Sequence, residues 1–338
     1  MGLLPSACMT RRATPTFKRD SLYGVYMGSR NCGVGTRCMT SAARILLDRE
    51  IPKKNLSFQS VSSIHQAWSK FSNFAHEKGI RRLEHITSDL AINYGKELAQ
   101  KVNAHECSAG YAQRLVSAVN TVMKLVNTRW RAVKPVKDCG IPKRMAVRVQ
   151  APSGMDKDDI DKAVAELRVN GLIRAAAIVQ LAWCFGLRVK EASLLDTNKA
   201  LAQCNEIGRF HVSAGTKGGR ARFAELRHSY QLVALRESAE VQQQNRSVLK
   251  SDSDWHAFRE RELFEARAVI KKHNIKQYHD LRAAYACHRY KQITGNDAPV
   301  LTGVIVDREA DRIARQQIAL ELGHNRISVV SAYVGGMA

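Results

Sequence analysis

The feature that most constrains the fold is a break in the helical pattern of hydrophobic residues near the middle of the chain. Residues 129–150 contain two prolines and a glycine and carry seven basic side chains against one acid, Asp138. Proline and glycine interrupt regular helices, while helix-spaced hydrophobic residues continue on both sides. A chain of 338 residues is also long enough for two cores. The sequence therefore predicts two domains joined by a basic linker at 131–150.

The stretch before this break has the pattern of a small helical domain, which we place at 51–130. Hydrophobic residues recur at helical spacing in the segments 64–75, 90–102 and 112–126. Thr87 precedes the second segment and is a suitable N-cap. These hydrophobic stripes predict a helical core.

Residues 1–50 have no such regular pattern until about Ser41–Asp48. Gly, Ser, Thr, Arg and Met dominate the segment, so we expect an irregular basic N-terminal arm. Two interpretations stay open for it: a tail without a role, including an over-extended start, or an arm that touches DNA.

The stretch 151–338 predicts a second domain of mixed secondary structure. Ser153 or Asp156 can cap a helix that ends at Asn170-Gly171, and a buried helix follows at about 172–184. Residues 207–227 read as strand, glycine-rich turn and strand, and a loop is expected at about 293–307. The predicted fold class is mainly α with a small β-hairpin, that is, α+β.

The charge of the chain favours a polyanionic partner. Lys and Arg number 53 against 31 Asp and Glu, a formal net charge of +22, which suits nucleic acid. The longest apolar run, Ala175 to Gly186, is too short for the roughly 20 residues of a membrane span, and we find no lipidation signal or basic amphipathic helix. Eight scattered cysteines without a C-x-x-C pair fit a cytosolic protein.

Six polar residues of the second domain could together perform chemistry on a phosphodiester. In chain order they are Arg188, Lys217, His279, Arg282, His324 and Tyr333. Arginine forks neutralise non-bridging phosphate oxygens. A proton donor is needed for the leaving oxygen, and a tyrosine hydroxyl can be the nucleophile.

The surroundings of these residues are consistent with such roles, although each residue alone is weak evidence. Arg188 ends an apolar run, and Glu191 lies one helical turn further on, where it could orient the guanidinium. Lys217 lies at a hairpin tip that lacks the spacing of a phosphate-binding P-loop. His279 and Arg282 share one helix face, where a bound anion would offset their mutual repulsion. We expect Arg220 and Arg222 to contact the backbone of a bound nucleic acid, DNA, and Tyr285 and Tyr290 to be core or surface residues of their helix.

The strings that hold these residues resemble the tyrosine recombinase (phage integrase) family. They are GLRVKEASLL, the hairpin VSAGTKGGRARFAEL, HDLR, and LGH followed nine residues later by Tyr333. The resemblance covers about residues 55–338. It implies a SAM-like core-binding domain before a recombinase-like catalytic domain, with both domains bound around a DNA duplex. It also implies that Arg188, Arg282 and His324 hold the phosphate, Lys217 is the general acid, His279 the acid–base partner and Tyr333 the nucleophile.

The resemblance further implies a site-specific recombinase that needs neither a metal nor ATP. Its partners would be double-stranded DNA, three further copies in a homotetramer on DNA and, in some systems, a DNA-bending accessory protein. It would act in the cytoplasm at the nucleoid, for integration or excision of a mobile element. A type IB topoisomerase and a non-catalytic DNA-binding protein are the alternatives.

Two features depart from the family pattern. The 42 residues from Arg282 to His324 include an expected insertion at 291–312, and only five residues follow Tyr333. We expect subunit contacts in any assembly to differ accordingly.

Overall fold

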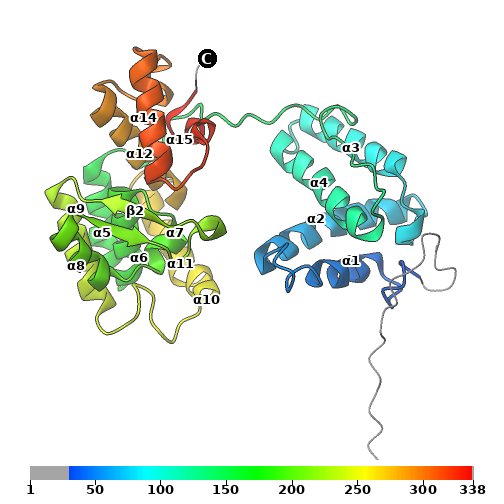
Figure 1. Ribbon diagram of the computed structural model, residues 1–338, viewed down its shortest axis with the longest axis horizontal. Helices are drawn as coiled ribbons and strands as arrows, with labels where there is room; N and C mark the ends of the chain where they lie inside the picture. The colour runs from blue at the N-terminus through cyan, green and yellow to red at the C-terminus, as the bar shows by residue number, and fades with distance from the viewer. Residues whose placement is uncertain (1–29, 337–338) are drawn as a thin grey trace, which may run out of the picture. The chain divides into compact units, whose positions relative to one another are not determined.

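The computed structural model describes residues 30–336. The chain divides into two compact units, Met1–Arg144 and Met145–Ala338; Figure 1 labels their helices and strands. No helix within the described residues is long and apolar enough to cross a membrane.

The first unit is entirely helical in its described part. Its elements are α1 (Met39–Asp48), α2 (Phe58–Glu77), the short 3₁₀ helix η1 (Leu83–His85), α3 (Ser88–Asn103) and α4 (Ala109–Val126). The side chains of Ser57, Thr87 and Ser108 accept hydrogen bonds from the first turns of α2, α3 and α4. Each of these three helices therefore begins where a hydroxyl side chain satisfies a free backbone N–H.

Aromatic side chains form the centre of the first core. Trp68, Phe71 and Phe74 of α2 line one face and meet Tyr94 of α3, with the Phe71 and Tyr94 rings 5.2 Å apart. The expected helical segments are confirmed, and their hydrophobic stripes form the core.

The irregular N-terminal arm predicted at 1–50 includes residues that form a helix. Residues 1–29 lie outside the described residues, but α1 is a helix whose Met39, Ala42, Ala43 and Leu47 are buried in the first core. Its hydrophobic face packs mainly on α2. Residues 39–48 thus belong to the helical domain.

The expected linker at 131–150 is also shorter than predicted. Trp130, Val133, Cys139 and Ile141 are buried in the first core. Towards its other end, Arg148 belongs to the second unit, where its side chain pairs with Asp280 at 2.8 Å. Several residues of the predicted basic linker therefore lie in or beside segments that are held by hydrophobic or ionic contacts.

The second unit contains a larger set of helices and a two-stranded antiparallel sheet. Its elements up to the hairpin are α5 (Lys157–Val169), α6 (Ile173–Phe185), α7 (Val189–Ser193), α8 (Thr197–Ile207), β1 (Arg209–Val212), η2 (Lys217–Gly219) and β2 (Arg222–Glu225). Those that follow are α9 (Ser229–Gln242), α10 (Trp255–Glu260), α11 (Glu262–Lys272), α12 (Tyr278–Thr294), α13 (Pro299–Thr302), α14 (Arg308–Glu321), η3 (Ile327–Val330) and α15 (Ser331–Val334). The predicted fold class is confirmed.

Helix α6 is the central element of this unit, because almost every one of its residues is buried. It packs against α5, α9 and α12. The helix ends at Gly186, whose φ of 61° is left-handed. A Cβ there would lie 2.5 Å from the Tyr285 ring and 2.9 Å from Leu322. Glycine is therefore required at this turn, which leads directly to Arg188.

The hairpin pairs Phe210 with Ala224 and Val212 with Arg222. Phe210, Val212, Ala224 and Arg222 all point inward, whereas Phe223 is 46% exposed. The alternation of β2 thus buries Arg222 and exposes Phe223.

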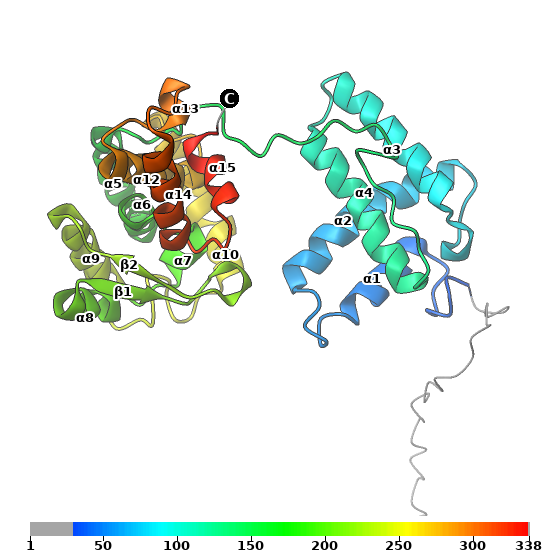
Figure 2. The same ribbon diagram turned by 45° about the horizontal axis from the view of Figure 1, so that its top comes forward.

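Helices α12, α14 and α15 lie side by side in both views of the second unit (Figures 1 and 2). Their buried residues form a separate small core that includes Tyr333. The loop expected at 293–307 contains the short helix α13, and α12 extends into it as far as Thr294.

Candidate active site

The site is built around Arg282, which is 1% exposed on α12. Its terminal nitrogens donate hydrogen bonds to the backbone carbonyls of Gly186 and Leu322. These carbonyls follow α6 and α14, so Arg282 is held between the ends of two helices. Each terminal nitrogen carries a second N–H. Burial lowers the pKa of Arg282 to about 10, and the guanidinium stays charged at neutral pH.

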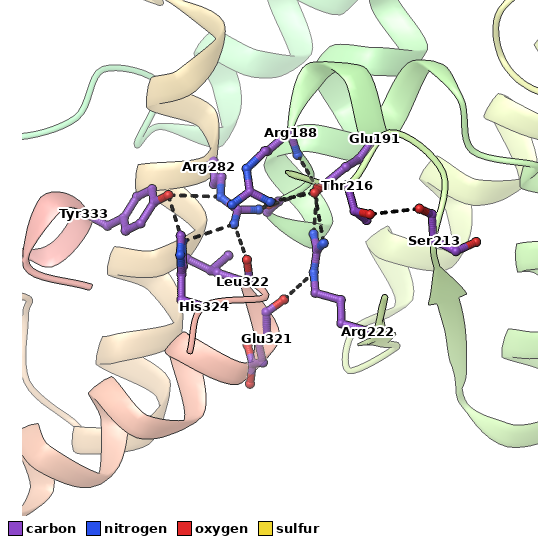
Figure 3. A network of polar contacts seen from close by, with 11 residues as sticks. Arg188, Glu191, Ser213, Thr216, Arg222, Arg282, Glu321, Leu322, His324 and Tyr333 are labelled. Atoms are coloured by element: carbon purple, nitrogen blue, oxygen red, sulfur yellow. Dashed lines mark hydrogen bonds and ion pairs between the residues drawn. The ribbon is translucent and has the colours of Figure 1, made fainter. Parts of the chain in front are cut away.

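Tyr333 comes to Arg282 from the last helix of the chain. Its hydroxyl accepts a hydrogen bond from Arg282 Nε at 3.4 Å and lies 3.1 Å from His324 Nε2. Tyr333 itself is only 4% exposed. In Figure 3 the hydroxyl points at both groups.

His324 lies just after α14, within 3.5 Å of Arg282 Nη2. Burial of the ring and the positive charges of Arg282, Arg188 and Arg222 lower its pKa to about 4. His324 is therefore neutral at pH 7. A neutral ring whose Nε2 carries the lone pair can accept a hydrogen bond from the Tyr333 hydroxyl, the nearer of its two neighbours.

His279 completes this side of the site. Its ring centroid lies 5.5 Å from that of Tyr333, and the residue is exposed. Partial desolvation and the charges of Arg282 and Arg188 lower its pKa. Among the described residues, His324 and Arg282 contact the Tyr333 hydroxyl, and no hydrogen bond joins His279 to it.

Arg188 is held on the other side by Glu191. Arg188 Nη1 donates to Glu191 Oε1 at 2.6 Å, and the Arg188 backbone N–H donates to Oε2 at 2.8 Å. The suggestion that Glu191 orients Arg188 is confirmed.

Glu191 is fully buried and serves more than one arginine. Arg222 donates to both of its oxygens, at 3.1 and 2.7 Å, and Arg282 Nη1 lies 3.8 Å from Oε2 (Figure 3). Burial alone would raise the pKa of Glu191, but these guanidiniums lower it to about 2. The carboxylate is ionised at neutral pH.

The structure thus brings five of the six predicted residues together: Arg188, His279, Arg282, His324 and Tyr333. Lys217 lies apart on the exposed hairpin tip. Among the described residues, no hydrogen bond or ion pair joins it to the other five.

Arg222 was misassigned from the sequence. It was expected to contact the DNA backbone, but it is buried and occupied by Glu191. Its position opposite Val212 was the available signal, since residues paired across a hairpin point to the same face. Tyr285 and Tyr290, expected to be core or surface residues, are buried in the core, and their hydroxyls donate to Glu321 and Asp311.

Comparison with known proteins shows which family part of the second unit resembles. The family model described as integrase matches residues 147–288. This segment is similar to the integrase family. The matched segment includes four of the six predicted site residues: Arg188, Lys217, His279 and Arg282. Together with the similar folds described below, the match confirms the resemblance to tyrosine recombinases. No curated protein matches the sequence significantly.

Solved structures of similar fold include a XerH recombinase and lambda integrase. A XerH site-specific recombinase in a post-cleavage complex with palindromic difH substrate is 13% identical, with 87% of this chain and 80% of that chain covered and a TM-score of 0.57. Lambda integrase bound to DNA is 13% identical over 86% of this chain and 96% of that one, with a TM-score of 0.53. A lambda integrase dimer bound to a COC′ core site is 15% identical, with 85% of this chain and 75% of that chain covered and a TM-score of 0.52. At these identities the likeness shows the fold.

Proposed function

We propose that this protein is a site-specific tyrosine recombinase that cleaves and rejoins double-stranded DNA through a 3′-phosphotyrosine. One observation carries the proposal: the hydroxyl of Tyr333 lies within hydrogen-bonding distance of Arg282 and His324. The integrase family match and the similar folds support it.

In the proposed reaction, the Tyr333 oxygen attacks the scissile phosphorus. A P–O bond to tyrosine forms as the bond to the 5′ oxygen breaks. Arg188 and Arg282 neutralise the charge that develops on the non-bridging oxygens. The backbone contacts of Arg282 fix its guanidinium and use one donor on each terminal nitrogen. The second N–H of Nη1 is available for the phosphate, whereas Nη2 also lies 3.5 Å from His324 Nε2.

Two proton transfers accompany the exchange of bonds. The tyrosine proton passes to a neighbouring imidazole: His324 Nε2 is 3.1 Å from the hydroxyl, whereas His279, the acid–base partner implied by the family resemblance, meets the ring. The leaving 5′ oxygen receives a proton from Lys217, brought in by the hairpin when DNA is bound. The phosphotyrosine ester conserves the bond energy, so rejoining requires no ATP, and these steps use protein side chains without a metal.

The proposed partner is duplex DNA, which the net charge of +22 favours. We propose that the helical domain and the catalytic domain both bind it, that four copies assemble on two sites, and that the reaction integrates or excises a mobile element, with a DNA-bending accessory protein where the site requires one.

The test is a suicide-substrate assay. Nicked duplexes with randomised cores are incubated in EDTA with wild type or with Tyr333→Phe and separated on a denaturing gel. We expect a slowly migrating covalent band from wild type alone, while Tyr333→Phe still shifts DNA on a native gel. DNA binding without a covalent band from any duplex in the pool would contradict the proposal and favour a binding protein. Relaxation of plasmids lacking a selected site, without exchange between sites, would favour a topoisomerase.

A further inference from the structure

The buried arginine of the hairpin, Arg222, connects three parts of the site. Its side chain is 5% exposed. Nη1 and Nη2 donate to the two oxygens of Glu191, and Nε donates to the backbone carbonyl of Glu321 at 2.8 Å. All three of its nitrogens are thus used inside the protein.

We propose that Arg222 is a positioning residue for DNA cleavage: it fixes Glu191 so that Arg188 and Arg282 are held with donors free for the phosphate, and it ties the hairpin to the end of α14. This inference rests on the proposed function, because it assigns Arg222 a role in that reaction.

Three guanidiniums compete for one carboxylate. Glu191 lies among three guanidiniums, at 2.6 Å from Arg188, 2.7 Å from Arg222 and 3.8 Å from Arg282. Arg222 contacts both oxygens and so fixes the plane of the carboxylate, as a forked donor does. Without Arg222, Glu191 would be free to turn towards Arg282 and occupy the donors that the phosphate needs.

The second connection runs to the turn before His324. Arg222 Nε binds the last residue of α14, and Arg222 Cδ lies 3.2 Å from where a Cβ on Gly323 would be. Gly323 has a φ of +67° and precedes His324. The stem of Arg222 therefore packs beneath the turn that aims His324 at Tyr333.

The hairpin is the third connection. Arg222 begins β2, directly after the tip that holds Lys217. Anchoring β2 to Glu191 and to α14 sets the base from which this tip reaches the site. A residue so used differs from a DNA-backbone contact, which would need donors open to solvent.

Four variants and a control test the proposal. The variants are Arg222→Met, Arg222→Lys, Glu191→Gln and the double variant Arg222→Met/Glu191→Gln. The control is Arg174→Met, because Arg174 is another buried arginine of the second unit, which donates to the backbone carbonyls of Val241 and Val248. It controls for the general effect of losing a buried guanidinium.

On a cleavable nicked duplex, we expect Arg222→Met to slow covalent-complex formation by about 10²-fold, the cost of a small displacement of catalytic groups. DNA affinity and its salt dependence should stay unchanged. Arg222→Lys should recover part of the rate, since an ammonium retains the charge but not the fork. In the double variant the loss should be less than the product of the two single losses, because Arg222 acts through Glu191. Arg174→Met should leave the rate unchanged.

The opposite pattern would overturn the proposal. If Arg222→Met cleaves at the wild-type rate but binds DNA more weakly with a smaller salt slope, Arg222 is a backbone contact. If Arg174→Met loses as much rate as Arg222→Met, the effect is one of general stability.

A measurement without DNA separates this inference from the proposed function. ¹⁵N relaxation of the arginine Nε–H groups reports their order on the ps–ns timescale. We expect the order of Arg188 to fall in Arg222→Met and to be unchanged in Arg174→Met; unchanged order in both would overturn the inference. Absence of a covalent complex from wild type itself would instead remove the proposed function.

Discussion

Replacement of Glu191 by glutamine tests the electrostatics of the site most directly in the absence of DNA. Glutamine has nearly the shape of a protonated carboxyl group and carries no charge. The surrounding guanidiniums lower the pKa of Glu191 from 4.5 to about 2. At about 1.4 kcal/mol per pH unit, this corresponds to about 3 kcal/mol of stability at pH 7. That agrees with the cost of removing one partner from a buried ion pair, about 3–5 kcal/mol.

The pH dependence of this effect has a definite sign. Because the pKa of Glu191 is lowered in the folded protein, its stabilisation is fully present above about pH 4.5 and is lost as the pH falls towards 2. The difference between wild type and Glu191→Gln should therefore be largest at neutral pH and shrink in acid.

Guanidinium-induced unfolding followed by tryptophan fluorescence measures it. Trp183 and Trp255 report on the second unit, and Trp68 and Trp130 on the first. The transition of the first unit, which does not contain Glu191, is the internal control. A difference of about 1 kcal/mol or less at pH 7, as for exposed ion pairs, would refute the reasoning, as would a difference that is the same at pH 7 and at about pH 3.

Three further predictions concern the remaining groups. Arg282→Lys should lower the cleavage rate by about 10²–10³-fold, as for loss of a donor to developing charge, measured as covalent-complex formation; near-normal cleavage would remove Arg282 from the reaction. DNA affinity should fall steeply with salt concentration because phosphate contacts release counterions; fluorescence anisotropy that shows a flat response would contradict this. An unfolded histidine binds a proton below about pH 6.5, whereas His324 in the folded protein binds one only near pH 4. The wild-type protein should therefore lose stability as the pH falls from about 6.5 to about 4. His324→Gln should flatten that slope, and an unchanged slope in urea unfolding would disprove the lowered pKa.

The helical cores could be predicted because their signals are local. The apolar spacing of α2, α3 and α4 and the caps Ser57, Thr87 and Ser108 act within a few residues of one another. In the same way, the buried helix α6 and its end at Gly186 follow from a continuous apolar run and a glycine.

Long-range packing explains why the bounds of the linker and of the N-terminal arm were predicted incorrectly. Trp130 and Ile141 look like parts of a basic linker because their neighbours are charged or proline, yet both are buried against helices distant in sequence. Helix α1 lies at the edge of an irregular stretch, and its apolar face acquires a partner only when α2 packs against it.

The site residues were predictable as a set, whereas their supports were not. Arg188, Arg282, His324 and Tyr333 were found because they stand in family-like strings. Arg222 was misread as a contact to the DNA backbone. Only the pairing with β1 and the burial of Glu191 show that the arginine faces inward. The position of Lys217 relative to the other five depends on the hairpin, whose tip is exposed.

The most direct test of the central claim is to identify the residue that becomes attached to DNA. The covalent complex from wild type and a nicked duplex is digested with nuclease and protease, and the modified peptide is sequenced by mass spectrometry. We predict a nucleotide joined through its 3′ phosphate to Tyr333. Attachment to another residue, such as Tyr285 or Tyr290, would contradict the account.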